Sequence, residues 1–271
     1  MPTEPNQQMS LFDLNSSPQP PNAVSSANTA KNTSSSDAPI SQGLKPQPLT
    51  ISSLTTSSLA ASSLGYASLD ELEQSLQGCQ KCPLSQSRTQ IVFERGNRQG
   101  KIVVIGEAPG QNEDELGLPF VGRSGQLLDK IFASVGLDTN RDVYICNVNK
   151  CRPENNRPPT DAEIAACKPF LLEQLRLLNP HIILLTGATA VKAILKTNLG
   201  ITKIRGQWSQ WEGRWVMPIF HPAYLLRNSS REVGKPKWLM WQDIQAVKAK
   251  LMELSGESPS AEAPDQDNEV F

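Results

Sequence analysis

Four of the five cysteines in this 271-residue chain have a spacing that suits metal binding. Cys79 and Cys82 form a Cys-x2-Cys pair, and Cys151 and Cys167 form a second pair separated by fifteen residues. Four thiolates are a common ligand set for zinc or for an iron–sulfur cluster, and spacing alone does not distinguish the two. Five unrelated buried cysteines are the alternative, because free cysteine is often part of a protein core. Cys146 lies in an apolar run and is expected to be such a core residue.

Four short motifs carry the other residues that are suited to chemistry. In chain order they are Gly106-Glu-Ala-Pro-Gly110, Leu118-Pro-Phe120-Val-Gly122, Asn147-Val-Asn-Lys-Cys151-Arg-Pro153 and His221-Pro-Ala-Tyr-Leu-Leu-Arg227. The first motif is neither G-x-G-x-x-G nor a P-loop, so it does not indicate a nucleotide-binding loop.

These motifs follow predicted strands, which must position them. The chain alternates short apolar runs with helical periodicity, a pattern typical of an α/β sheet with crossover helices. Ser68 with Glu71 and Thr160 with Glu163 have the spacing of capping boxes and predict helix starts. The sequence therefore predicts a three-layer α/β/α fold with a central, mostly parallel sheet and a ligand site at the carboxyl ends of its strands. Strands are predicted at 102–105, 143–145 and 181–185, a hairpin and last core strand within 204–219, and helices at 68–78, 124–135, from 160 onward, 188–195 and 237–254.

Composition divides the chain into three segments. Residues 1–65 are rich in Ser, Thr, Pro, Asn and Gln, and residues 256–271 are acidic, so both are expected to be disordered tails around a domain at 66–255. The formal net charge of the whole chain is −1, with −1 on residues 1–65 and −5 on residues 256–271, which leaves +5 on the domain. This mild excess suits a polyanionic partner without proving one.

The sequence contains no apolar run of the roughly eighteen residues that a membrane span needs. Its beginning has neither the pattern of a secretory signal nor an Arg-rich transit peptide. We therefore expect a cytoplasmic protein with no membrane partner.

Together, the four motifs and four cysteines closely resemble the family 4, iron–sulfur uracil-DNA glycosylases of the uracil-DNA glycosylase superfamily, over about residues 66–255. The resemblance implies a uracil-DNA glycosylase-like fold and a monofunctional enzyme that hydrolyses the N-glycosidic bond of uracil in DNA to start base excision repair. It implies that Cys79, Cys82, Cys151 and Cys167 hold a 4Fe-4S cluster, with Cys146 left out. We accordingly expect a nucleoid-associated monomer.

The resemblance also implies roles for individual site residues. Gly106, Glu107 and Ala108 match the turn that lines the uracil pocket. Phe120 matches the ring that stacks on the base, Asn147 the amide that reads its edge, and His221 the imidazole near its O2.

The chemistry of these side chains agrees with such roles. An enzyme that acts on a base in duplex DNA must flip it into a pocket that has an aromatic platform and polar groups to read the edge. Asn147 can donate to O4 and accept from N3–H of uracil, whereas cytosine would leave buried polar groups unpaired at a cost on the order of 1–3 kcal/mol each. The alternative for Asn147 is a loop residue that satisfies local backbone groups.

Catalysis requires stabilisation of negative charge on the departing uracil and of positive charge on the sugar. His221 can hydrogen-bond O2, whereas His181, at the start of an apolar strand, is expected to be structural. Better-known relatives have Asp where this chain has Ala108, so the obvious acid for positioning water is absent. Glu107 and Glu113 are the remaining candidates, although Glu113 lies on an acidic loop and could simply be solvated.

The last motif offers groups for contacting DNA. Leu225 or Leu226 could fill the space left by a flipped base, and Arg227 could contact a phosphate. Either leucine could instead belong to the core.

Two non-catalytic classes are alternatives to a glycosylase. The cysteines could hold a metal or cluster in a non-enzymatic DNA-binding or polymerase-associated module, or the chain could transfer electrons, although its sequence shows no second redox centre. Separately, the segment Gln8-Met9-Ser10-Leu11-Phe12 resembles the short peptide by which bacterial repair and replication proteins bind the sliding clamp, which makes that clamp an expected partner.

Overall fold

The computed structural model describes residues 63–256 and Phe271. Its helices are α2 (Leu69–Leu76), α3 (Gln111–Leu116), α4 (Arg123–Ala133), α5 (Asp161–Leu178), α6 (Ala188–Leu195), α7 (Ile201–Ile204), α8 (Pro222–Arg227) and α9 (Pro236–Ser255), with 3-10 turns at Pro83–Ser85 and Glu154–Asn156. Its strands are β1 (Arg95–Gly96), β2 (Ile102–Gly106), β3 (Val143–Asn147), β4 (Ile182–Thr186), β5 (Ser209–Trp211) and β6 (Arg214–Ile219). No helix in this described part is long and apolar enough to cross a membrane.

The six strands form one sheet in the order β1-β3-β2-β4-β6-β5. The four central strands are parallel, and the short strands β1 and β5 pair antiparallel at the two edges. After β2 the chain adds β3 on one side and then crosses to add β4 on the other side. The carboxyl end of β2 is therefore the point at which the winding direction changes, where open α/β sheets bind their ligands.

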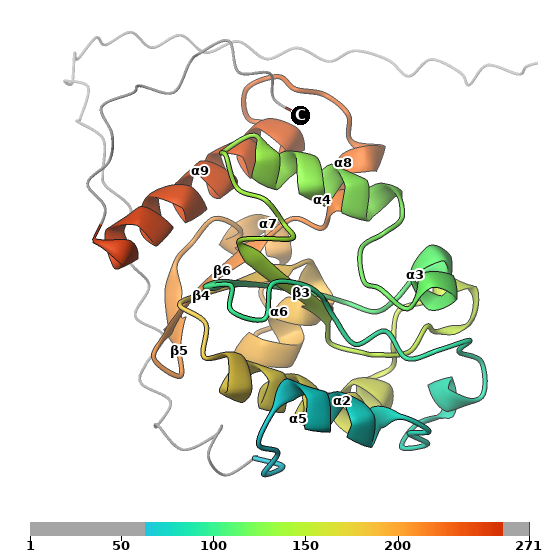
Figure 1. The fold of residues 1–271 in the computed structure, drawn as a ribbon. Helices are drawn as coiled ribbons and strands as arrows, with labels where there is room; N and C mark the ends of the chain where they lie inside the picture. Colours follow the sequence, from blue (N-terminus) through green and yellow to red (C-terminus); the bar gives the residue numbers. More distant parts are fainter. Residues whose placement is uncertain (1–62, 257–270) are drawn as a thin grey trace, which may run out of the picture. The chain divides into compact units, whose positions relative to one another are not determined.

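Helices cover both faces of the sheet (Figure 1), with an apolar core beneath each layer. Residues Ile102, Val104 and Ile145 face the core beneath α4, α8 and α9, whereas Val103 and Ile105 face the core beneath α5 and α6. Alternation along a strand sends successive side chains to opposite faces, and burial of both faces explains why these strands are continuously apolar. The predicted three-layer α/β/α fold with a mostly parallel sheet is confirmed.

Helix boundaries agree with the capping signals, with one difference in detail. Thr160 and Glu163 form the predicted capping box at the start of α5. At α2 the Ser68 hydroxyl accepts from the Glu71 N–H, but the Glu71 carboxylate accepts from the Ala67 N–H instead of closing the box. The helices α3 and α8 were not predicted, because each is only six residues long and begins inside a motif that reads as a loop.

Much of the expected tail segments lies outside the described residues, including the clamp-like segment Gln8–Phe12. Ordered contacts begin slightly before the expected domain start at residue 66. The backbone N–H groups of Leu64 and Tyr66 donate to the Glu173 carboxylate at 3.1 and 3.0 Å. Phe271, within the expected acidic tail, packs against the core under α9, and its carbonyl oxygen accepts from Lys237 Nζ at 3.0 Å.

Candidate active site and cysteine pocket

Gly106 and Asn147 lie side by side at the carboxyl ends of β2 and β3. They are register partners in the parallel pair. A Cβ atom built on Gly106 would lie 2.3 Å from Asn147 Oδ1 and 2.6 Å from the edge of the Phe120 ring. Glycine is therefore required at position 106, because any side chain would displace the amide and the ring. The structure therefore brings together Gly106, Phe120 and Asn147, which are spread over about forty positions of the sequence.

Asn147 is almost fully buried, at 2% relative exposure. Within residues 63–256, the backbone of Asn147 makes hydrogen bonds and its side-chain amide makes none. The amide is therefore available for hydrogen bonds to a ligand. The alternative in which this amide satisfies its own loop is therefore not what the structure shows.

Phe120 has a strained backbone that a second residue holds in place. Its φ of 55° is in the left-handed region, which typically costs a non-glycine residue about 1–3 kcal/mol. The Arg95 guanidinium donates to the carbonyl oxygens of Pro119 at 2.8 Å and Phe120 at 3.2 Å, and pairs with Asp129 at 2.7 Å. A Cβ on Gly125 would lie 1.6 Å from the Phe120 carbonyl oxygen, so α4 must present glycine there.

His221 caps α8 and is held as a neutral ring. Its Nδ1 accepts from the Ala223 N–H at 3.1 Å, so in the neutral ring the proton is on Nε2. Burial lowers the pKa of His221 to about 4, and the positive charge of Arg227 acts in the same direction. The ring lies 5.8 Å from the Phe120 ring, centroid to centroid, at an interplanar angle of 28°. At neutral pH this imidazole is therefore a hydrogen-bond donor beside the aromatic platform.

The two candidate carboxylates have different environments. Glu107, after β2, accepts a hydrogen bond from the Thr189 hydroxyl in the first turn of α6. Glu113 accepts from the backbone N–H groups of Gly110, Val121 and Gly122 at 2.8–3.1 Å. The expectation that Glu113 could be simply solvated is therefore wrong, since it ties the Phe120 loop to the Gly110 turn. Ala108 lies on the same turn as Glu107 and is partly exposed.

Leu225 and Leu226, the two leucines predicted as a possible wedge, differ in their exposure to solvent. Leu225 is 0% exposed and belongs to the core under α8, so it cannot enter DNA, and this part of the prediction is wrong. Helical periodicity explains the difference, because successive residues of α8 point about 100° apart. Leu226 is 38% exposed, and Arg227 is exposed beside it.

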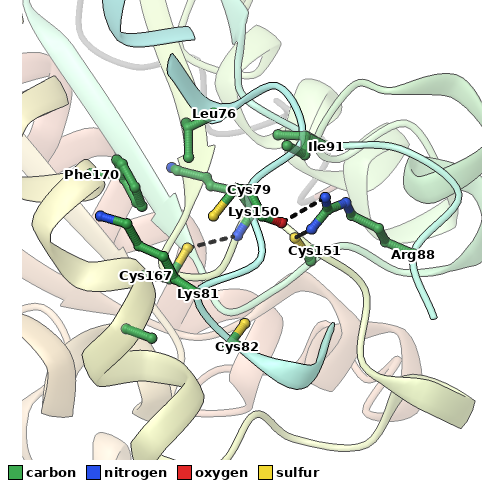
Figure 2. A pocket seen from close by; sticks show the side chains of 11 residues that line it. Leu76, Cys79, Lys81, Cys82, Arg88, Ile91, Lys150, Cys151, Cys167 and Phe170 are labelled. Carbon is green, nitrogen blue, oxygen red and sulfur yellow. Dashed lines mark hydrogen bonds between the residues drawn. The ribbon is translucent and has the colours of Figure 1, made fainter. Parts of the chain in front are cut away.

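The four predicted cysteine ligands line one pocket, shown in Figure 2. They come from the loop after α2, from the loop after β3 and from α5, and the apolar side chains Leu76, Ile91 and Phe170 complete the lining. Cys146 lies elsewhere, fully buried in β3, as expected of a core residue. Within residues 63–256, however, no three His, Cys, Asp or Glu side chains stand as an assembled metal site.

The donor set of this pocket fits a thiolate-ligated metal centre. Arg88 Nη1 donates to Cys151 Sγ and the Lys150 N–H donates to Cys167 Sγ, each at 3.3 Å. Such N–H to sulfur bonds are typical around iron–sulfur ligands. Burial raises the pKa of Cys167 to about 11, although the Lys150 charge opposes this. An occupying metal centre would have to displace that proton.

Three residues of the site were missed by sequence reasoning. Lys150 is part of the motif at 147–153, and its place directly before Cys151 could have indicated a role in the site. Thr189, in the first turn of a helix that follows a strand, had only a weak signal. Arg95 had none, because its partners lie in a loop about twenty-five residues later.

Comparison with known proteins agrees with this geometry. A family model described as the uracil DNA glycosylase superfamily matches residues 93–245, which include the site motifs. The chain belongs to this superfamily.

Individual proteins similar to this chain show to which group of the superfamily it belongs. The type-4 uracil-DNA glycosylase of Thermotoga maritima is 44% identical over 183 residues, which cover 67% of this chain and 93% of that protein. The type-4 uracil-DNA glycosylases of Archaeoglobus fulgidus and Saccharolobus solfataricus are 41% and 40% identical, and each alignment covers 59% of this chain and 83% and 78% of the respective relative. Within the superfamily the chain is a member of the type-4 group, which confirms the resemblance seen in its motifs.

Proposed function

We propose that this enzyme removes uracil from DNA by hydrolysing its N-glycosidic bond, the first step of base excision repair. The observation that carries this proposal is the convergence of Gly106, Phe120, Asn147 and His221 at the carboxyl edge of the sheet. A site that holds a flipped pyrimidine and stabilises its departure needs an aromatic platform, an amide that reads the edge of the base and a neutral imidazole.

Recognition of uracil rests on the Asn147 amide. Its oxygen can accept from uracil N3–H and its nitrogen can donate to O4, while Phe120 supports the flat face of the base. Cytosine presents the opposite pattern and would leave buried polar groups unpaired, at about 1–3 kcal/mol each.

Departure of uracil is assisted by His221. As negative charge develops on the base, the Nε2–H donor can strengthen its hydrogen bond to O2. The donor is in place at neutral pH because the Ala223 N–H occupies Nδ1. No proton transfer from the ring is required for this role.

Glu107 is the residue we propose for positioning the attacking water. The Thr189 hydroxyl holds its carboxylate from α6, whereas Glu113 is fully engaged with backbone donors. Replacement of Glu107 by Gln should slow release more than replacement of Thr189 by Val, because the second change leaves the carboxylate in place. Single-turnover rates of the two variants that are equal to that of the unchanged enzyme would remove Glu107 from this role.

We propose that Cys79, Cys82, Cys151 and Cys167 hold a 4Fe-4S cluster. When bound, the cluster would cross-link three segments of the chain, and hydrolysis of a base needs no electron from it. Around it the chain supplies N–H donors from Arg88 and Lys150 and an apolar wall.

DNA contact is proposed for the exposed end of α8. Leu226 could fill the space left by the flipped base, and Arg227 could contact a neighbouring phosphate. The site then combines a pocket for the base with an apolar wedge and a cation beside it.

The activity is tested on a labelled duplex that carries one uracil. Incubation with the purified protein followed by alkaline treatment should cleave the labelled strand at the uracil position. Matched duplexes with cytosine or thymine at that position should remain intact. Binding to the uracil duplex without any alkali-labile site would instead support the alternative of a non-enzymatic DNA-binding module.

A bacterial sliding clamp is proposed as a partner on the basis of sequence alone, since Gln8–Phe12 lie outside the described residues. A peptide covering residues 1–20 should bind the clamp, and a version with Leu11→Ala and Phe12→Ala should bind more weakly, because paired apolar side chains anchor such peptides. Equal binding by both peptides, or none at about 100 μM, would remove this partner without affecting the glycosylase activity. We also propose that the enzyme is a monomer, which sedimentation would test.

A further inference from the structure

Lys150 connects the cysteine pocket with the uracil-reading residue. Its side chain is 1% exposed, and its Nζ donates to the backbone oxygen of Asn147 at 2.7 Å and to Gln174 Oε1 at 2.5 Å. The same residue lines the cysteine pocket, where its backbone N–H donates to Cys167 Sγ (Figure 2). One lysine therefore contacts both sites at once.

The environment of this amine is unusual for a buried cation. Both of its hydrogen-bond acceptors are neutral oxygens. Gln174 is itself fixed, since its amide nitrogen donates to the Tyr144 hydroxyl at 2.7 Å and to the Phe93 carbonyl at 3.3 Å. A buried charge is costly unless a nearby charge of opposite sign compensates it. Glu94 is one nearby charge of opposite sign, since the Lys150 charge acts to lower its pKa, and four thiolates on iron in the adjoining pocket would add further negative charge.

We propose that Lys150 is a positioning residue that couples the two sites. Its amine fixes the Asn147 carbonyl and therefore the end of β3, and its charge raises the reduction potential of the cluster. The inference rests on the proposed function. The carbonyl of Asn147 lies at the exit of β3, where a small backbone shift would carry the side-chain amide away from the uracil edge. A cation beside the cluster favours the more negative, reduced state of the iron.

The test is Lys150→Met in the full-length, cluster-loaded protein. Methionine has a similar length but no charge and no donor. We expect the midpoint potential of the cluster, measured by spectroelectrochemical titration, to fall below that of the unchanged protein. Single-turnover release of uracil should slow by about 10²-fold, as expected for a misplaced catalytic group, while the KM changes by less than about threefold.

The matched control is Tyr144→Phe, which removes the far hydroxyl of the same network and leaves Lys150 untouched. It should keep both the potential and the release rate of the unchanged protein, although the protein becomes less stable. If Lys150→Met shows the potential and rate of the unchanged protein, the proposal is wrong. If Tyr144→Phe reproduces both changes, general loosening of the core explains them and the proposal is also wrong.

A second variant decides the matter if Lys150→Met does not fold. Gln174→Glu places a carboxylate against the amine, so the Lys150 bond to Asn147 is kept while its charge is compensated locally. The potential should fall and the release rate should stay within about threefold. An unchanged potential would overturn the proposal. Absence of iron or of uracil release in the unchanged protein would instead overturn the proposed function, so the two failures are distinguishable.

Discussion

At the scale of single residues, the site depends on how a few polar groups are kept available for a ligand. Asn147 is buried with a side-chain amide that makes no hydrogen bond among the described residues, and His221 has one ring nitrogen occupied by a backbone donor. Most buried polar groups in proteins are satisfied internally. These two side chains therefore have the arrangement expected of groups that complete their hydrogen bonds on a substrate.

The Asn147 amide can be tested by truncation. Asn147→Ala should slow single-turnover release of uracil by about 10²-fold, the scale of one lost transition-state hydrogen bond in a dry site. The measurement is the rate of formation of alkali-labile sites at saturating enzyme. A rate within about threefold of the unchanged enzyme would show that recognition occurs elsewhere.

The state of His221 predicts a pH profile. Because its pKa is lowered to about 4, the ring stays neutral as the pH falls through the usual titration range near 6.5. Release should therefore be constant from about pH 8 to pH 5 and fall only near pH 4, where the protonated Nδ1 can no longer accept from Ala223. Loss of activity with a midpoint near pH 6.5 that disappears in His221→Ala would contradict this.

At the scale of elements, the carboxyl ends of the parallel strands bring the site residues together, and one edge strand holds the loop in which Phe120 has a positive φ. Gly106 and Asn147 end adjacent strands, and His221 follows β6. Phe120 is not on the sheet, and its loop is fixed by Arg95 from β1, by Glu113 from α3 and by close contact with α4. The short edge strand thus contributes the residue that orients the aromatic platform.

Arg95→Met tests this contribution. The change leaves the Pro119 and Phe120 carbonyls without their donor, and each lost bond to a buried acceptor typically costs about 1–3 kcal/mol. We expect a lower free energy of unfolding in urea and a raised KM for uracil-containing DNA. Lys101→Met, at an exposed position before β2, is the control and should change neither quantity. An unchanged KM in a destabilised Arg95→Met protein would limit Arg95 to a structural role.

At the scale of the whole molecule, the cysteine pocket joins segments that are far apart in the chain. It brings the loop around Cys79 and Cys82 against Cys151 after β3 and Cys167 in α5. A shared metal centre can stabilise such an arrangement in the way that a cross-link does, because binding free energy becomes folding free energy. The same α5 also carries Gln174, so the pocket and the sheet edge share one helix.

The protein should be yellow-brown, with broad absorbance near ~400 nm from thiolate-to-iron charge transfer. Replacement of Cys79, Cys82, Cys151 or Cys167 by Ser should lose the metal and much of the soluble protein, as judged by iron analysis and absorbance. Cys146→Ser should keep the iron, because Cys146 lies in the core of β3 away from the pocket. A colourless, zinc-loaded and active protein would exclude the iron assignment.

The sequence by itself determined the class of fold and the four motifs, and it predicted four cysteines as metal ligands. Those features are local, since apolar runs, capping residues such as Thr160 and short loop patterns are written in neighbouring positions. Only the tertiary structure decided which leucine of α8 is core, that Glu113 accepts from backbone N–H groups, and that Arg95 and Lys150 donate to the backbone carbonyls of Pro119 and Asn147. These outcomes depend on contacts between residues distant in the chain, and a side chain's burial and partners are fixed only when the sheet and its helices pack.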